Sequence, residues 1–243
     1  MQTKIFAHRG ASKTAAENTM EAFEAAIKQG ADGIELDIQK SKDDQILVSH
    51  DENLKRVTLV DRAIAETDYA EIKKLNAAAF RPDDQPAYVP LLEEVLDLVK
   101  PTNLEINIEL KNSLVLYPRL EEDCLALVKK FGMEDRIVFS SFNHYSIMKL
   151  LALGTKSEVA FLYLEGLYQP WLYANNNQVQ GLHPYYPNLM IPDYIKESHA
   201  LGVKVRPWTV DDEAMMKKLL ALEVDAIITN IPAPALAIRD AQV

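Results

Sequence analysis

Two carboxylates lie two residues apart in the apolar stretch 33–38, which reads Gly-Ile-Glu-Leu-Asp-Ile. The stretch is typical of a buried strand, where successive side chains point to opposite faces, so Glu35 and Asp37 share one face. Two negative charges on one buried face repel each other and are costly to remove from water unless a positive group lies between them. A divalent cation is the simplest such group. Ion pairs with lysine or arginine are the alternative, and they are the ordinary explanation for such a triplet taken alone.

Further motifs with ionisable or aromatic side chains accompany this triplet. They are Ala7-His8-Arg9-Gly10, Glu17-Asn18-Thr19, His50-Asp51, Val-Pro-Leu-Leu-Glu-Glu-Val-Leu at 89–96, Glu109-Leu110-Lys111, Ser141-Phe142 and Trp208-Thr209-Val210. In this order the motifs resemble those of the glycerophosphodiester phosphodiesterase family, in its bacterial cytoplasmic type, along almost the whole chain. The resemblance implies metal-dependent hydrolysis of glycerophosphodiesters, such as glycerophosphocholine or glycerophosphoethanolamine, to sn-glycerol 3-phosphate and an alcohol.

Strand-like and helix-like segments alternate along the chain. Apolar or β-rich runs recur near residues 4–8, 33–38, 104–110, 136–140, 157–163, 178–182, 203–207 and 224–229. About eight βα units in roughly 250 residues predict an α/β protein, a single (β/α)8 TIM barrel over residues 1–243. An open doubly wound sheet is the alternative, but no glycine-rich phosphate loop follows any of these runs.

Residues 52–88 interrupt the alternation. The segment is polar and much longer than a usual βα loop of about 2–6 residues. We expect an insertion after the second strand, on the catalytic face of the barrel. By resemblance, a small subdomain here covers the active site and helps to select the alcohol. The chain departs from the family pattern at 54–62, which lack the usual glycines, and at Asn230, where Asp is common. These departures leave the conformation of the insertion and the choice of substrate open.

The candidate ligands fall at or near the carboxyl ends of the predicted strands, where TIM barrels gather their active sites. Glu35, Asp37 and Glu109 are expected to form an all-oxygen site. Such a site suits one hard cation, Mg²⁺ or Ca²⁺, rather than Zn²⁺. Arg9 and Lys111 are expected to neutralise phosphate oxygens beside it, where negative charge builds up in the transition state.

His8 and His50 are the candidate acid–base catalysts, because imidazole exchanges protons near neutral pH. One would deprotonate the attacking oxygen and the other would protonate the leaving alkoxide. The resemblance implies attack by the neighbouring glycerol hydroxyl, which forms a cyclic phosphate that water then opens. Direct attack by water is the alternative, and the sequence does not distinguish the two routes.

Four further residues are expected near the site, each with a second interpretation. Phe142 and Trp208 either line the pocket beside the glycerol carbons or only pack at strand ends. Asn18 is expected to cap the first helix, as the spacing Asn18-x-x-Glu21 predicts, and could bind phosphate as well. Glu17 either joins the surroundings of the cation or holds Arg9.

Composition limits the partners. The chain has 243 residues, a net charge of −10 and no clustered lysines and arginines, which disfavours nucleic acid and anionic membranes. No run approaches the roughly 20 apolar residues of a membrane span. The first residues lack the features of a secretion signal, so we expect a cytoplasmic protein. The oligomeric state is open, and a homodimer is one candidate.

Two alternative functions stay open at this point. A related barrel phosphodiesterase could act on lysophospholipids or stop at the cyclic phosphate, although the polar segment 52–88 contains no obvious membrane-facing loop. A non-catalytic barrel could bind a phosphorylated metabolite. Such a barrel would need the positive groups but not a pair of histidines, which argues against it.

Overall fold

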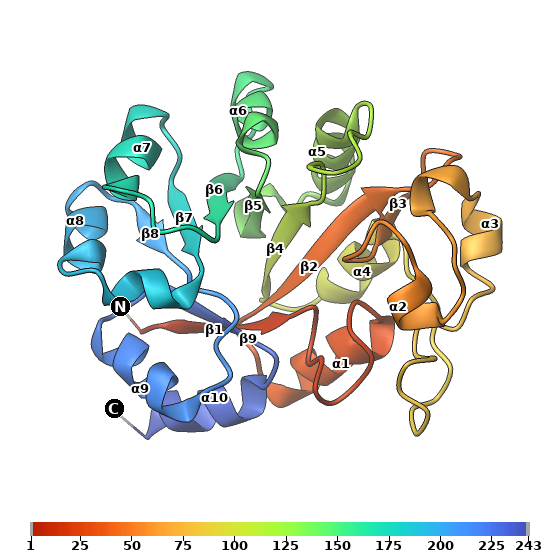
Figure 1. Cartoon of the computed structure of the whole chain (residues 1–243), viewed down its shortest axis with the longest axis horizontal. Helices are drawn as coiled ribbons and strands as arrows, with labels where there is room; N and C mark the ends of the chain where they lie inside the picture. Colours follow the sequence, from red (N-terminus) through yellow and green to blue (C-terminus); the bar gives the residue numbers. More distant parts are fainter. Residues whose placement is uncertain (1, 242–243) are drawn as a thin grey trace.

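Eight parallel strands within residues 2–241, the part of the chain that the computed structural model describes, curl into a nearly closed barrel (Figure 1). Their order around the barrel is β8-β7-β6-β5-β4-β2-β1-β9. Their bounds are β1 Lys4–His8, β2 Gly33–Lys40, β4 Glu105–Leu110, β5 Ile137–Ser141, β6 Glu158–Tyr163, β7 Gly181–Pro184, β8 Lys204–Val205 and β9 Ala226–Thr229. The predicted (β/α)8 barrel is confirmed.

Backbone hydrogen bonds join the two ends of this strand order. The N–H of Asp225 donates to the carbonyl of Val205 at 3.0 Å, and that of Ile228 donates to the carbonyl of Pro207 at 3.0 Å. The N–H of Val210 returns a bond to the carbonyl of Ile228 at 2.9 Å. The segment that follows β8 therefore lies against β9, which is itself paired with β1.

Helices cover the outside of the barrel (Figure 1). They are α1 Met20–Gln29, α4 Leu92–Val99, α5 Leu120–Phe131, α6 His144–Ala152, α7 Pro170–Asn176, α8 Tyr194–Ala200, α9 Glu213–Ala221 and α10 Pro232–Asp240, with 3-10 turns η2 Glu134–Arg136 and η3 Tyr186–Met190. None of the helices in the described range has the length and apolar character needed to cross a membrane.

The alternation along β2 separates the apolar core from the barrel interior. Ile34, Leu36 and Ile38 are fully buried in the main apolar cluster of the protein. Each such side chain contributes about 1.5–3 kcal/mol when it is removed from water. Because side chains alternate along a strand, this packing turns Glu35 and Asp37 to the opposite face, inside the barrel. Burial of one face thus forces two carboxylates into the interior.

The first helix begins one residue later than expected. Thr19 rather than Asn18 is its N-cap, and the Thr19 hydroxyl accepts a hydrogen bond from the N–H of Ala22 at 3.3 Å. Asn18 adopts a left-handed backbone with φ of 55° and donates from Nδ2 to Asp37 Oδ2 at 2.9 Å. The expectation that Asn18 caps the helix is wrong, because its amide pairs with a buried carboxylate. Gly30 ends the helix in a left-handed backbone with φ of 79°.

A short strand that the sequence did not suggest, β3 Ile46–Val48, pairs antiparallel with the end of β2. The segment 52–88 follows it and contains α2 Lys55–Thr58, η1 Ile64–Glu66 and α3 Tyr69–Ile72. This segment lies beside the carboxyl end of β2, in orange and yellow in Figure 1. Leu54, Ile64 and Ile72 are fully buried in an apolar cluster separate from that of the barrel. Residues of 52–88 therefore share a second small core with Leu47 of β3 and with Val89.

Replacing Thr19 with Ala should lower the free energy of unfolding by about 1 kcal/mol, because the first turn of α1 loses its capping oxygen. Urea unfolding followed by circular dichroism would measure the change. Thr14→Ala is the matched control, because the exposed Thr14 hydroxyl accepts only from Gln29. Equal stability of the two variants would contradict the assignment of the cap.

Candidate active site

Polar side chains from several strand ends converge on one pocket of the barrel. The pocket encloses about 400 Å³, its open mouth included. Its lining residues are His8, Arg9, Glu35, His50, Asn107, Glu109, Phe142, Leu162, Trp208, Thr209 and Ile228. The other predicted site residues lie directly behind this lining. Asp37 is 3.5 Å from Arg9, Asn18 bonds to Asp37, and Lys111 bonds to Glu109. The structure therefore brings every predicted site residue into one cluster.

The three predicted cation ligands form the buried wall of this cluster. Asp37 of β2 is the direct neighbour of Glu109 in β4 in the parallel pairing, and Glu35 lies on the same face of β2. One carboxylate oxygen from each lies within 4.8 Å of the other two, and all three residues are buried. Asp37 Oδ1 is buried without a hydrogen-bond partner. An all-oxygen set with an unpartnered buried oxygen fits a hard divalent cation.

The pKa values of these carboxyl groups are pushed apart. Burial raises the pKa of Glu35 well above its usual range, and the charges of Asp37 and Glu109 add to the effect. Burial and the charge of Asp37 likewise raise the pKa of Glu109 to about 7, although Lys111 opposes the shift. Burial acts in the same direction on Asp37 and is the largest single influence, but the charges of Arg9 and its other cationic neighbours, with the hydrogen bond from Asn18, together outweigh it and hold the pKa of Asp37 below its usual range. Full ionisation of the three groups therefore requires additional positive charge.

Two cationic side chains border the carboxylates. Arg9 donates from a guanidinium nitrogen to Glu17 Oε1 at 2.7 Å, and its backbone N–H donates to Glu35 Oε2 at 3.0 Å. Lys111 Nζ lies 2.9 Å from Glu109 Oε1. Arg9 is held in a left-handed backbone with φ of 55°, a conformation that costs energy in a residue with a side chain. Of the two interpretations of Glu17, the structure shows the pairing with Arg9.

His8 lies at the end of β1 with its two ring nitrogens in different surroundings. Nδ1 is 2.8 Å from Oδ1 of Asn230, and Nε2 is 3.9 Å from Oε2 of Glu35. Burial and the neighbouring charge of Arg9 lower the pKa of His8 to about 4. The ring is therefore neutral at physiological pH and carries one proton on one of its two nitrogens.

His50 lies between an acidic and a basic partner. Its Nδ1 is 2.6 Å from Asp51 Oδ1, and its Nε2 is 3.2 Å from Lys111 Nζ. An ammonium group can only donate, so Nε2 accepts from Lys111 and Nδ1 carries the proton that binds Asp51. This pair of contacts holds the ring with Nε2 toward the pocket.

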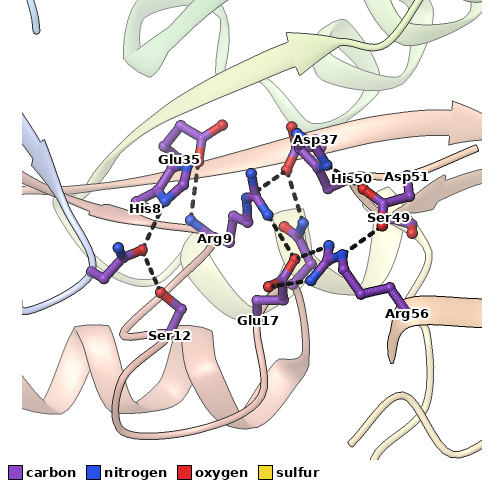
Figure 2. Close-up of polar contacts among 12 residues, drawn as sticks. His8, Arg9, Ser12, Glu17, Glu35, Asp37, Ser49, His50, Asp51 and Arg56 are labelled. Carbon is purple, nitrogen blue, oxygen red and sulfur yellow. Dashed lines mark hydrogen bonds and ion pairs between the residues drawn. The ribbon is translucent and has the colours of Figure 1, made fainter. Parts of the chain in front are cut away.

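Arg56 of α2 connects the histidine and arginine sides of the site (Figure 2). Its guanidinium donates to Asp51, the partner of His50. It also donates to both oxygens of Glu17, at 2.9 and 2.7 Å, and Glu17 in turn binds Arg9. One side chain of the segment 52–88 is thus bonded to the partners of two pocket residues.

Two aromatic rings form the apolar side of the pocket. The rings of Phe142 and Trp208 meet edge to face with centroids 5.5 Å apart. Trp208 is fixed by a hydrogen bond from Nε1 to the carbonyl of His183 at 2.7 Å. Both rings line the pocket, so the pocket has an apolar part as well as the polar part that the carboxylates form.

Several residues of the site were not foreseen from the sequence. Asn107 lines the pocket two residues before Glu109, so the period of the strand could have revealed it. Asn230 was noticed only as a departure from a family pattern. Arg56 carries no local signal, because its role depends on how residues 52–88 fold back onto Glu17.

Comparison with known proteins agrees with this geometry. Residues 8–233 match the model of the glycerophosphoryl diester phosphodiesterase family. A glycerophosphodiester phosphodiesterase of Caldanaerobacter subterraneus subsp. tengcongensis is 40% identical over 96% of this chain and 96% of its own. A human lysophospholipase D is 28% identical over 95% of this chain and 84% of its own.

One similar solved structure contains a bound product. It is a phosphodiesterase of Oleispira antarctica in complex with its product sn-glycerol-3-phosphate, with a TM-score of 0.87, 26% identity, and coverage of 98% of this chain and 97% of that one. The family match spans nearly the whole chain, and the barrel and pocket described above are intact. The chain therefore belongs to the glycerophosphoryl diester phosphodiesterase family of enzymes.

Proposed function

We propose that this enzyme hydrolyses glycerophosphodiesters, such as glycerophosphocholine or glycerophosphoethanolamine, to sn-glycerol 3-phosphate and an alcohol. One observation carries the proposal. A single pocket contains three buried carboxylates, two cationic side chains and two histidines whose Nε2 atoms face the pocket or its wall. The Oleispira relative, which holds sn-glycerol-3-phosphate, supports the same product here.

We propose that Glu35, Asp37 and Glu109 hold one divalent cation, Mg²⁺ or Ca²⁺. The shared position of their oxygens and the unpartnered Asp37 Oδ1 support this set. A bound cation would neutralise charge that builds up on the phosphate oxygens in the transition state. Oxygen ligands and the absence of sulfur or imidazole among them favour a hard cation over zinc.

Arg9 and Lys111 would bind phosphate oxygens next to the carboxylates. Asn18 is less suited to that task than the sequence suggested. One of the two N–H groups of its Nδ2 already donates to Asp37, and its unpartnered buried atom is Oδ1, an acceptor that cannot bind an ionised phosphate oxygen. We propose instead that Asn18 orients Asp37. Phe142 and Trp208 would lie beside the glycerol carbons.

We propose that His8 takes the proton of the attacking hydroxyl as the new bond to phosphorus forms. The low pKa of His8 keeps its ring neutral and able to accept a proton. His50, which carries its one proton on Nδ1, would first take up a second proton on Nε2 once Lys111 turns from Nε2 to the phosphate, and would then give that second proton to the alcohol oxygen as its bond to phosphorus breaks. If the attacking group is the glycerol 2-hydroxyl, water opens the resulting cyclic phosphate with the two roles reversed.

Residues 52–88 would cover the site and help to select the alcohol. Their contact with the catalytic groups runs through Arg56, which supports this role. The cytoplasmic location and the homodimer stay predictions.

A lysophospholipid is the second candidate substrate, and one observation favours it. The connections that follow β4, β5 and β6, including the first turn of α6 after β5, expose large side chains such as Leu114, Tyr145 and Tyr168, which are 82%, 88% and 89% exposed. These connections lie at the carboxyl ends of the strands, the same end of the barrel as the pocket. Within 52–88 itself, Leu59 is 66% exposed.

Release of glycerol 3-phosphate from glycerophosphocholine and glycerophosphoethanolamine, with lysophosphatidylcholine in parallel, tests both candidates. We expect release from the two glycerophosphodiesters to stop with chelator and to return with Mg²⁺ or Ca²⁺. The second candidate would be favoured if lysophosphatidic acid formed from lysophosphatidylcholine faster than glycerol 3-phosphate formed from the two glycerophosphodiesters. Folded, cation-loaded protein that converts none of the three would overturn the proposed function.

His8→Ala and His50→Ala should each reduce kcat by about 10²–10⁴-fold, because each removes one proton transfer. Thermal unfolding should show that both variants are folded. His199→Ala is the control, since His199 pairs with Asp225 on the outside of the barrel. Wild-type turnover by His50→Ala would remove that residue from the mechanism.

Cation affinity should rise with pH between about pH 6 and 8, because protons compete at Glu109, whose pKa is about 7, and at Glu35. These raised pKa values mean that the chelator-treated fold binds more protons than the unfolded chain. The two groups therefore lower the stability of chelator-treated protein as pH rises from the usual value of 4.5 through about 7. Added cation should raise the melting temperature most at high pH.

Calorimetry at several pH values, with chelator or with Mg²⁺ or Ca²⁺, measures this dependence. Glu35→Gln should weaken cation binding by about 10–100-fold. Glu105→Gln should leave it unchanged, since Glu105 pairs with Lys4 at the other end of β4. A cation response that is independent of pH, or that survives in Glu35→Gln, would argue against this ligand set.

A further inference from the structure

The hydrogen bonds around Asn230 determine how its side-chain amide is turned. Its Nδ2 donates to Asp211 Oδ2 at 2.7 Å, and a carboxylate oxygen can only accept. The amide oxygen therefore points the other way. There Oδ1 accepts from the hydroxyl of Ser12 at 2.8 Å and lies 2.8 Å from Nδ1 of His8.

This orientation fixes the proton on His8. Because Asn230 Oδ1 is an acceptor, Nδ1 of His8 must be the nitrogen that carries hydrogen. The lone pair of the neutral ring is then on Nε2, on the side of Glu35. The opposite tautomer would set the lone pair of Nδ1 against the lone pairs of Asn230 and would leave Nε2 unable to accept a proton.

Asp211 is itself held by two further donors. Its Oδ1 accepts from the Thr229 hydroxyl at 2.9 Å and from the backbone N–H of Asn230 at 2.9 Å. Asp211 follows β8 and Asn230 follows β9, so the contacts cross the seam where the barrel closes. Neither residue lines the pocket.

We propose that Asn230 and Asp211 are positioning residues that hold His8 in the Nδ1-protonated tautomer, with Nε2 free to accept the proton of the attacking hydroxyl. The catalytic part of this inference rests on the proposed function, whereas the tautomer itself does not. The two residues act through His8 and touch neither the substrate nor the carboxylates that would hold the cation.

Exchanging the two side chains tests the proposal. In Asp211→Asn the new amide can lie in two orientations. In one, its nitrogen faces Nδ2 of Asn230, which is also a donor. In the other, its nitrogen takes the place of the oxygen that accepts from the Thr229 hydroxyl. In Asn230→Asp two carboxylates face each other. The double variant D211N/N230D restores a complete set, because the amide at 211 can accept from Thr229 and donate to the carboxylate at 230, which accepts from His8.

We expect kcat to fall about 10²-fold in Asn230→Leu and to fall in both single exchanges, with KM and cation affinity nearly unchanged. The double exchange should recover much of the loss. Ser12→Ala, which removes the other donor to the same oxygen, is the control and should stay close to wild type. Melting temperatures of all variants separate a loss of fold from a loss of positioning.

Nitrogen-15 spectra of histidine-labelled protein read the tautomer without any substrate, and the His8→Gln spectrum identifies the His8 signals. Wild type should show hydrogen on Nδ1, and Asn230→Leu should lose this preference. An unchanged tautomer in Asn230→Leu, or a double exchange no better than the single ones, would overturn the proposal. A wild type that shows the tautomer but converts no glycerophosphodiester would overturn the proposed function and leave the positioning intact.

Discussion

The confinement of three carboxylates to one buried space is the constraint on which the rest of the site depends. Glu35, Asp37 and Glu109 are brought together by the alternation of β2 and its register with β4, which the apolar outer face of the sheet enforces. Like charges at this distance in a poorly solvated space oppose ionisation, as the raised pKa values of Glu35 and Glu109 show. Every cationic or amide group around them lowers that cost.

The ion pairs that compensate these negative charges extend well beyond the three carboxylates. Arg9 neutralises Asp37 and is held by Glu17, which is also bound by Arg56. Lys111 neutralises Glu109 and contacts His50. The charges thus alternate in sign across the site, from the barrel interior to the segment 52–88. Such a network is stable only when all its members are present, because a buried charge without its partner is costly.

The sequence predicted the parts of this arrangement that follow from local periodicity. The eight strands, the barrel and the shared face of Glu35 and Asp37 could be predicted because burial imposes a period of two on each strand. The cap of the first helix was assigned to Asn18 rather than Thr19, since both types favour that position and the deciding contact, with Asp37, is distant in sequence.

The contacts of Asn230 and Arg56 could not be predicted for the same reason. Asn230 meets His8 only because the last strand pairs with the first, and this contact joins residues 222 positions apart. Arg56 reaches Glu17 through the fold of an insertion whose short helices have weak sequence signals. The periodicity of the sequence identifies which residues share a face of a strand. Contacts between residues on opposite sides of the barrel depend on the three-dimensional arrangement of the strands.

The seam between β8 and β9 has a consequence for how the enzyme is assembled during synthesis. All the candidate cation and phosphate ligands lie within the first 111 residues, which emerge from the ribosome early. Asp211 and Asn230, by contrast, are made after all of these ligands, and they reach His8 only when β9 has paired with β1. A growing chain therefore contains every group that binds before it contains the groups that orient its first histidine. The orientation of His8 is completed by the same event that closes the barrel.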